Sequence, residues 1–341
     1  MASYLLRTSV MSAGHGINFP GAIRCPITIY READDTSFSF PNASPPTPNP
    51  DPPGLLPVFI MQGTGTASDA VTIASGSGRR FVEAGLFSSH DGSSDDFVTD
   101  SAFGFLRSDM VILSETGRPC AIRQLSADPP ALPIPPGSLT APAPTNLVHE
   151  SGTEHTSFNN PSGIIHNGST VAYTASAKVT SLGAGPPLGP GLSIHRFSVN
   201  GTNFQRLNMM TNTTDILFGN VMTFQAQYGF RTTTNTVQWC TGPGDASCAN
   251  FTDDATGWRR VHAIRFAMVI RNPQFENNQR DADGNCNSSP ATLTWWDDDG
   301  TGSDSPLGSF DLSAVTDGRC YRHYVVETTV PLKNMIWNME Q

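Results

Sequence analysis

The sequence predicts a β-rich fold of many short strands joined by long loops, with one short helix at its start. Charged residues make up only 15% of the 341-residue chain, while 31 glycines and 27 prolines supply turn formers. That composition argues against a helical bundle. The 19 Phe, 6 Tyr and 5 Trp residues provide enough apolar bulk for a packed core, which argues against disorder.

The N-terminal helix is predicted at residues 3–13, because apolar residues recur there near helical spacing and Gly14 can end the helix. A short strand is expected at 70–73, between turn signals. Residues 109–113 and 120–125 are expected to pair as strands across the turn SETGRP. The front half therefore contributes one helix and a few strands.

The back half has a more regular strand pattern. Residues 170–180, 192–199 and 203–207 alternate like half-exposed strands, and Asn200-Gly201 is a strong hairpin signal between the last two. We therefore expect a sheet built from neighbouring segments of this half.

Three further segments, 216–230, 258–272 and 324–332, each have an apolar side with period two. We expect 324–332 to be a central core strand that pairs antiparallel with the two segments before it, because no crossover helix intervenes. Two proline-rich stretches, 41–57 and 128–146, are predicted to be surface loop insertions, since proline lacks a backbone donor.

The charge balance argues against some partners. The formal net charge is −10, from 20 Lys and Arg against 30 Asp and Glu. A negative surface repels phosphate backbones and anionic lipid headgroups, so we expect no nucleic-acid contact. No apolar run approaches the roughly 20 residues of a membrane helix, and no secretory signal opens the sequence.

An even number of cysteines without any C-x-x-C spacing predicts an extracytoplasmic, disulfide-bonded chain. The alternative is six buried thiols in a cytosolic protein. Cys240 and Cys248 flank a turn and are the favoured bridge among many connectivities. Elimination then favours two further pairs, Cys286 with Cys320 and Cys25 with Cys120. Because no export signal accompanies these cysteines, we expect that a segment was removed from the front of the chain.

The sequence shows no pattern of an active site, since it lacks a nucleophile elbow and a phosphate-binding Gly-Lys-Ser/Thr. The densest histidine group is HESGTEH, with His149, Glu150, Glu154 and His155. Its spacing fits no common metal site, so we interpret it as a solvated loop. We therefore predict that the protein is not an enzyme.

Two acidic loops form a candidate calcium site, because calcium prefers six to eight oxygen ligands and such turns concentrate carboxylates and carbonyls. The candidate ligands are Asp281, Asp283 and Asn285 in the first loop and Asp297 and Asp299 in the second. The spacing differs from that of an EF-hand. The competing interpretation is that Asp and Asn simply form turns here.

The two ends of the chain carry a recognisable pattern. The start, SYLLRTSVMSAGHGI, has Ala13, Gly14 and Gly16 around His15, and the end, RHYVVETTVPLKNMIW, contains Glu-Thr-x-Val-Pro-Leu-Lys-Asn. The segments between them that extend the pattern are GTASDAVTI, SDMVILSETGRPCAI, LSIHRFSVNG, ILFGNVMTFQAQYGF and VHAIRFAMVIRNP. Taken in order, these segments resemble PilW-type minor pilins of the type IV pilus assembly machinery, although members of that family usually have an aromatic residue in place of His15.

The resemblance implies an α+β, pseudopilin-like fold, with a short N-terminal helix packed on predominantly antiparallel sheets. Residues 1–16 would be the remnant of the N-terminal pilin helix and 17–341 a single globular β-rich head with insertions at 41–57 and 128–146. The resemblance also supports the pairing of Cys25 with Cys120. It implies a truncated apolar helix upstream, through which alone the protein would contact a membrane.

The implied function is that of a non-catalytic minor pilin that initiates pilus assembly and forms the pilus tip complex. Its partners would be other minor pilins and a tip adhesin. The head would be periplasmic, anchored in the bacterial inner membrane before assembly, and later at the pilus tip on the cell surface. The alternative is a calcium-dependent secreted adhesin or carbohydrate-binding module that acts alone.

Overall fold

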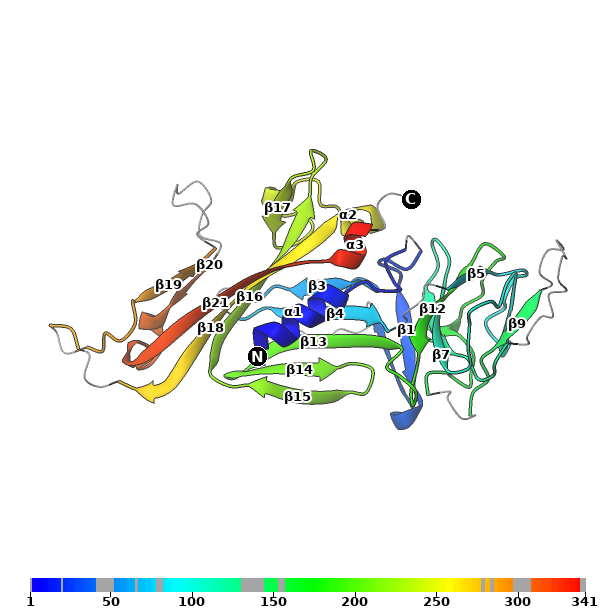
Figure 1. Cartoon of the computed structure of the whole chain (residues 1–341), viewed down its shortest axis with the longest axis horizontal. Helices are drawn as coiled ribbons and strands as arrows, with labels where there is room; N and C mark the ends of the chain where they lie inside the picture. Colours follow the sequence, from blue (N-terminus) through cyan, green and yellow to red (C-terminus); the bar gives the residue numbers. More distant parts are fainter. Residues whose placement is uncertain are drawn as a thin grey trace.

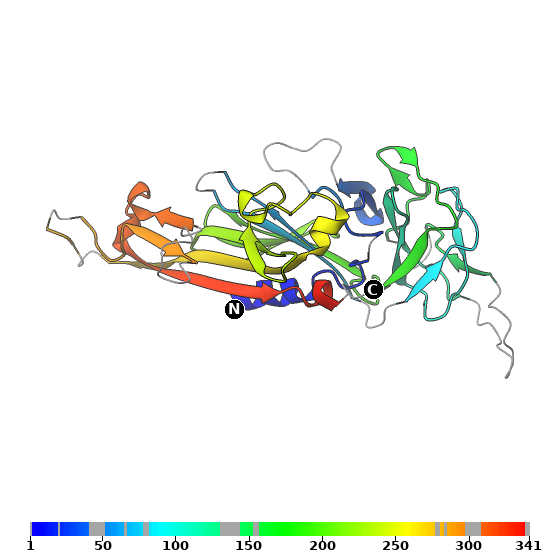
Figure 2. The same ribbon diagram turned by 90° about the horizontal axis from the view of Figure 1, so that it is seen from above.

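The computed structural model describes residues 2–19, 21–40, 52–64, 67–77, 82–129, 144–152, 157–276, 280–282, 285–296 and 308–337. The fold is mostly β, with a short N-terminal helix and several antiparallel sheets, as the sequence predicts. Figures 1 and 2 show an elongated molecule in which α1 lies near the middle, with different sheets extending to the two ends.

The helices of the described chain are short. They are α1 (Ala2–Ser12), α2 (Ala255–Arg259) and α3 (Lys333–Trp337), with 3-10 turns at Glu32–Asp34, Ala246–Cys248, Leu312–Ala314 and Gly318–Cys320.

Two sheets form the middle of the molecule and one of its ends. The first, which we name the central sheet, has the order β15 (Thr213–Phe218), β14 (Asn203–Asn208), β13 (Leu192–Asn200), β4 (Ala70–Gly76) and β3 (Val58–Met61). The second, the C-terminal sheet, has the order β17 (Val237–Cys240), β16 (Val221–Arg231), β18 (Val261–Phe275) and β21 (Tyr321–Pro331).

The other end is a distal lobe with a six-stranded distal sheet and two strand pairs. The distal sheet has the order β2 (Thr36–Phe40), β1 (Ile27–Arg31), β8 (Cys120–Gln124), β7 (Asp109–Ser114), β12 (Lys178–Ala184) and β5 (Glu83–Gly85). The pairs are β6 (Asp96–Thr99) with β9 (Thr145–Val148), and β10 (Ile165–His166) with β11 (Ser169–Thr170). The pairing of β1 with β8 is parallel, whereas the other pairings of the described strands are antiparallel.

The first helix forms where the sequence predicts it, and its apolar side faces the sheets. Leu6 and Val10 are one turn apart and almost completely buried, whereas Tyr4 and Arg7 are exposed. Each fully buried aliphatic side chain contributes roughly 1.5–3 kcal/mol. Gly14 has a φ of +79°, which permits the chain to turn sharply after the helix.

The central and C-terminal sheets share one apolar core with α1. Its members from α1 are Leu6, Val10 and Ala13, those from the central sheet include Val58, Ile60, Val71, Ile73, Phe197 and Phe204, and those from the C-terminal sheet include Val221, Phe224, Phe266, Met268 and Val330. In Figure 1 the helix crosses the surface where these two sheets meet. We name the side of the C-terminal sheet that faces α1 its inner face.

Asp69 joins these two sheets through hydrogen bonds. Its backbone N–H donates to the Phe224 carbonyl at 2.8 Å, and its carboxylate accepts from the backbone N–H groups of Gly63 and Ala226, both at 2.7 Å. Because β17 pairs with β16 only from Tyr228 onward, the earlier part of β16 has a free edge that Asp69 satisfies.

The outer face of the C-terminal sheet is covered by a small hairpin, β19 (Thr292–Trp295) and β20 (Gly308–Asp311). The apolar cluster under this hairpin comprises Ala267, Val269, Leu293, Trp295, Trp296 and Leu312, with Val325 packed against it. The C-terminal sheet is therefore packed on both faces, by α1 on the inner face and by β19–β20 on the outer face.

The six cysteines form three disulfides, Cys25–Cys120, Cys240–Cys248 and Cys286–Cys320. These are the pairs that the sequence favours. The first joins β8 of the distal sheet to the turn before β1, and the other two lie within the last third of the chain.

Some strand predictions are confirmed and others are wrong. The Asn200-Gly201 turn joins β13 to β14, and β7 pairs with β8, as expected. The predicted strand 170–180 is instead the end of β11, a turn and the start of β12, because Thr174 and Ser176 bind Glu115 and turn the chain.

The segment 216–230 is two strands rather than one, since Asn220 adopts a φ of +62° between β15 and β16. The closing strand was expected to be central, but β21 is an edge strand that pairs with β18 alone. Its one buried residue, Val330, is explained by packing in the core that contains α1 rather than by a second neighbouring strand.

The proline-rich insertions lie largely outside the described residues, at 41–51 and 130–143. The described residues at the C-terminal ends of both insertions are not surface loops, whereas Asp128, at the start of the second insertion, is exposed as predicted. Leu55 and Leu56 are buried, and Leu55 exchanges backbone hydrogen bonds with Arg24 and Cys25. Thr145 and Asn146 belong to β9. Proline is compatible with burial here because the flanking leucines carry the apolar contacts and the hydrogen bonds.

Candidate assembly site around the first helix

The C-terminal segment of the chain contacts the C-terminal end of α1. Val330, Leu332 and Met335 are almost fully buried in the same apolar core as Leu6 and Val10. Leu332 follows β21 directly, and its backbone N–H donates to the His262 carbonyl of β18 at 2.7 Å, which fixes the chain as it enters α3. Residues more than 300 positions apart in sequence therefore meet at one end of the helix.

Asn334 caps the helix. Its Nδ2 donates to the carbonyls of Ser12 at 3.1 Å and Ala13 at 3.0 Å. The last carbonyls of an α-helix have no partner within the helix, so a side-chain donor placed there removes a cost of burial. The Asn334 carbonyl in turn accepts a hydrogen bond from Asn18 Nδ2. The helix end is thus held by side chains rather than by solvent.

The Ala-Gly-His-Gly segment after α1 requires small residues. A Cβ on Gly14 would lie 3.1 Å from the Met335 sulfur and 3.3 Å from the Pro57 side chain. Gly14 donates its N–H to the Ala74 carbonyl at 2.9 Å, and the carbonyl of His15 accepts from Gly76 at 2.7 Å. The glycines therefore permit the chain to pass close to β4 and α3.

The inner face of the C-terminal sheet extends beyond the N-terminal end of α1 (Figure 1). Along β21, Val330 is fully buried under the helix, whereas Tyr324 on the same face is 53% exposed. Ile270 of β18 pairs with Tyr324 and is only partly buried. On α1 itself, Tyr4 is 67% exposed. We name these residues the exposed apolar strip: Tyr4, Tyr324 and the partly buried Ile270 and Val326. The strip lies toward the N-terminal end of α1.

Two buried polar groups of the core near the helix, Tyr228 and Asp69, form hydrogen bonds. Tyr228 is fully buried in the core, and its phenolic oxygen accepts a hydrogen bond from the Ile60 backbone N–H. Burial raises the pKa of Tyr228 well above its usual value, so it stays neutral. Burial also raises the pKa of Asp69 to about 6, against the opposing effect of its two backbone N–H donors.

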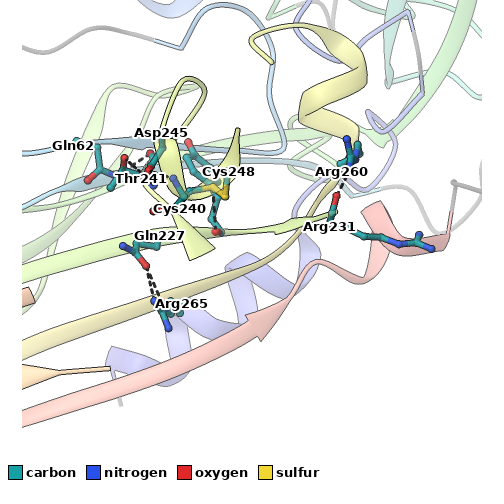
Figure 3. Close-up of a disulfide and its surroundings, with 11 residues drawn as sticks. Gln62, Gln227, Arg231, Cys240, Thr241, Asp245, Cys248, Arg260 and Arg265 are labelled. Carbon is teal, nitrogen blue, oxygen red and sulfur yellow. Dashed lines mark hydrogen bonds between the residues drawn. A yellow bond between two sulfur atoms is a disulfide. The ribbon is translucent and has the colours of Figure 1, made fainter. Parts of the chain in front are cut away.

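Figure 3 shows the surroundings of the Cys240–Cys248 disulfide, which ties β17 to the following turn beside β16. Nearby, Arg265 donates from Nε and Nη2 to Gln227 Oε1 at 3.0 Å and 2.8 Å. Its guanidinium also lies 4.6 Å from the ring centroid of Trp239 and 4.7 Å from that of Trp296. This buried arginine is therefore enclosed by an amide and two indole rings.

Only two of the five candidate calcium ligands, Asp281 and Asn285, lie in the part of the chain that the structure describes. Asp281 and Asn285 form a tight turn in which the Asp281 carboxylate accepts from the Asn285 N–H at 2.8 Å. Asp283, Asp297 and Asp299 lie outside the described residues. Among the described residues, no group of three or more His, Cys, Asp or Glu side chains is placed to hold a metal ion. The calcium site stays a prediction.

The sequence predicts a solvated loop at residues 149–155, but its first residue, His149, is buried. His149 is buried against the Phe97 ring, with the two centroids 4.1 Å apart, whereas Glu150 is exposed. Glu154 and His155 lie outside the described residues. The reason is that His149 follows β9 directly and continues its inward-facing positions.

Comparison with known proteins assigns the C-terminal part of the chain. Residues 192–334 match the family model described as PilW, Type IV Pilus-assembly protein W. Residues 192–334 form a PilW domain. The match begins at the first residue of β13 and ends at Asn334, the residue that caps α1. It covers less than half of the chain. No curated protein and no solved structure matched this chain.

The PilW domain implies a role in type IV pilus assembly and indicates a structural pilus protein rather than an enzyme. Its disulfides agree with an extracytoplasmic location. Among the helices of the described residues, none is both long enough and apolar enough to cross a lipid bilayer.

The closing motif is visible in the sequence, but the function of its last residue is not. The pattern Val-Pro-Leu-Lys-Asn marked the region, yet only the fold brings Asn334 to the carbonyls of Ser12 and Ala13. Asp69 gave no signal beyond that of a turn residue, because its partner strand β16 lies far along the chain.

Proposed function

We propose that this chain is a minor pilin that helps to initiate type IV pilus assembly and forms part of the pilus tip complex through protein–protein contacts. The observation that supports this best is the capping of α1 by Asn334, the last residue of the PilW match. Because the PilW domain holds α1 in this way, a protein that packs along α1 would be held in a fixed orientation relative to that domain.

In this proposal residues 1–16 are the end of a longer pilin helix. An apolar helix upstream would continue α1 along the exposed apolar strip that contains Tyr324 and would anchor the protein in the inner membrane before assembly. The head would then be periplasmic, and after assembly it would lie at the pilus tip. Other minor pilins and a tip adhesin are the proposed partners.

Two surface variants of β21 test the proposal. Tyr324 faces the inner side of the sheet, and Thr329 faces the outer side and is also exposed. Both side chains project from the same strand, so Tyr324→Glu and Thr329→Glu place the same new charge on opposite faces. Both variants are expected to fold, because neither position is buried.

Tyr324→Glu is expected to reduce the number of surface pili in cells that depend on this gene, since a charge in the strip opposes helix packing. Thr329→Glu is expected to leave pilus number near that of the wild type. Pili counted by electron microscopy decide the matter, with protein abundance measured in the same cells. Equal pilus numbers for the two variants would contradict the role proposed for the inner face.

A further inference from the structure

Arg123 is a buried cation in the core of the distal lobe. It lies on β8 between Ala121 and Leu125, whose side chains face the same apolar cluster. Only 4% of Arg123 is exposed. Its Nη1 donates to the Ile122 carbonyl at 3.1 Å, while its buried Nη2 has no hydrogen-bond partner among the residues that the structure describes. Burial lowers the pKa of Arg123 to about 10, so the guanidinium remains charged at neutral pH.

Two buried histidines lie beside this arginine. His90 and His149 are each 4% exposed, and their ring centroids are 5.8 Å apart. Within the described part of the chain, Nε2 of each ring is buried without a hydrogen-bond partner. Nδ1 of His90 accepts from the Gly92 N–H at 2.9 Å, so the ring proton is on Nε2, which is a donor. The charge of Arg123 acts on both rings, in addition to the larger effect of burial, to lower their pKa values.

The nearby acidic and phenolic groups are engaged elsewhere. Asp91 accepts from the Ser93 and Ser94 N–H groups, Asp96 accepts from Asn146, and Tyr173 donates to the Pro119 carbonyl. Asp95 is exposed and attracts Arg123, but these residues form no ion pair within the described part of the chain. Among the described residues the interior therefore holds a positive charge and buried donors without an acceptor side chain, and the Ser94 backbone is the group that favours the charged form of His90 most.

An unpaired charge in an apolar interior is costly, and a native structure normally supplies a counter-charge or several hydrogen bonds. We propose that Arg123, His90 and His149 bind one small monovalent inorganic anion, of the size of chloride or bromide, inside the distal lobe. The anion accepts from Arg123 Nη2 and His90 Nε2, and from His149 Nε2 in the tautomer that places its proton there.

The chemistry of the surroundings sets the class of ligand. The three side chains are enclosed by the apolar cluster that includes Phe97, Leu125 and Tyr173, so a ligand with an organic body has no access to them. A divalent anion would require more donors than the site offers. The two imidazoles do not bind a metal cation here, because the charge of Arg123 would repel it. The inference does not depend on the proposed role in pilus assembly.

The first experiment measures thermal unfolding of the whole chain in sodium gluconate, with bromide added at constant ionic strength. We expect a saturable rise in Tm of about 5 °C when bromide exceeds its dissociation constant a hundredfold. Arg123→Met is expected to lose this rise. Arg265→Met is the matched control, because Arg265 is equally buried but already has Gln227 as an acceptor, and it is expected to retain the rise.

Bromide-soaked crystals of the wild-type chain give a second test that does not depend on how the variants fold. The expected result is an anomalous peak within hydrogen-bonding distance of Arg123 Nη2. An ordered water at that place with no anomalous peak would overturn the proposal, as would a Tm that responds to bromide equally in wild type and Arg123→Met.

Discussion

The C-terminal sheet and the distal lobe each bury an arginine in a β-sheet core, but they surround it differently. Arg265 on β18 has Gln227 as an acceptor and two indole rings close to its guanidinium. Arg123 on β8 lies beside two histidines and has an unpartnered Nη2. The first arrangement is complete within the protein, whereas the second is the kind that a ligand completes. The first arginine lies within the PilW domain, whereas the distal lobe, which contains the second, lies outside the family match.

The disulfides divide between the same two regions, and their removal should give the largest difference. Cys25–Cys120 closes a separation of 95 residues beside the distal sheet, while Cys240–Cys248 closes one of 8 residues. Loop-closure entropy grows with loop length, so we expect the Cys25→Ala, Cys120→Ala protein to lose about 2 kcal/mol more unfolding free energy than the Cys240→Ala, Cys248→Ala protein. Urea unfolding of both double variants measures this. Equal losses would show that strain or residual structure outweighs loop length.

The two arginines provide the next largest contrast. Arg265→Met removes two charge-assisted hydrogen bonds and two cation–π contacts, and we expect it to cost about 3 kcal/mol. Arg123→Met replaces an unpaired buried charge by an apolar side chain, and in halide-free buffer we expect a change near zero or a gain in stability. Urea unfolding monitored by tryptophan fluorescence compares them. A loss of several kcal/mol in Arg123→Met without halide would show that Arg123 is satisfied within the protein.

Acidification should decrease the unfolding free energy by a smaller amount, and we expect a buried histidine of the distal lobe to contribute to this decrease. Burial holds the pKa of His149 well below its usual value of 6.5 in the folded protein, with Arg123 and His90 acting in the same direction. The unfolded chain therefore takes up a proton as the pH falls below 6.5, while the folded chain does not, and stability decreases in that range. His149→Phe keeps an aromatic ring against Phe97 and removes this proton uptake.

We expect the unfolding free energy of His149→Phe to decrease less steeply than that of the wild type between pH 7 and about pH 5. His262→Phe is the corresponding variant in the PilW domain, where burial lowers the pKa of His262 to about 4, and it should reduce the slope as well. Parallel curves for wild type and His149→Phe would contradict the assignment of a neutral, buried His149.

Local signals in the sequence predicted local structure. They did not predict contacts between distant segments. The Asn200-Gly201 turn and the helix that ends before Gly14 are set by neighbouring residues, so they could be predicted. Asp69 forms a hydrogen bond with Ala226, 157 residues away, and Asn334 forms one with Ala13, 321 residues away. Turn-forming residue types alone do not reveal such partners. Arg123 stood in a predicted strand, but its burial depends on the β6–β9 layer that covers it.

The edge position of β21 was also not predictable from local sequence signals, because strand order depends on contacts between distant segments. Its period-two pattern identified the residues that share the inner face, but within β21 only Val330 of that face is buried, where α1 packs on the sheet. Sequence periodicity reports which residues share a face and does not report strand order. The distinction matters for function, because the part of β21 that extends beyond α1 leaves Tyr324 accessible.

The most direct test of the account is the number of surface pili in a strain that lacks this gene. We predict few or no pili, and full recovery with the wild-type gene or with Arg123→Met, whose change is confined to the distal lobe. Val330→Asp, which places a charge directly under α1, is predicted not to restore pili. Normal pilus number in the deletion strain would contradict the central claim.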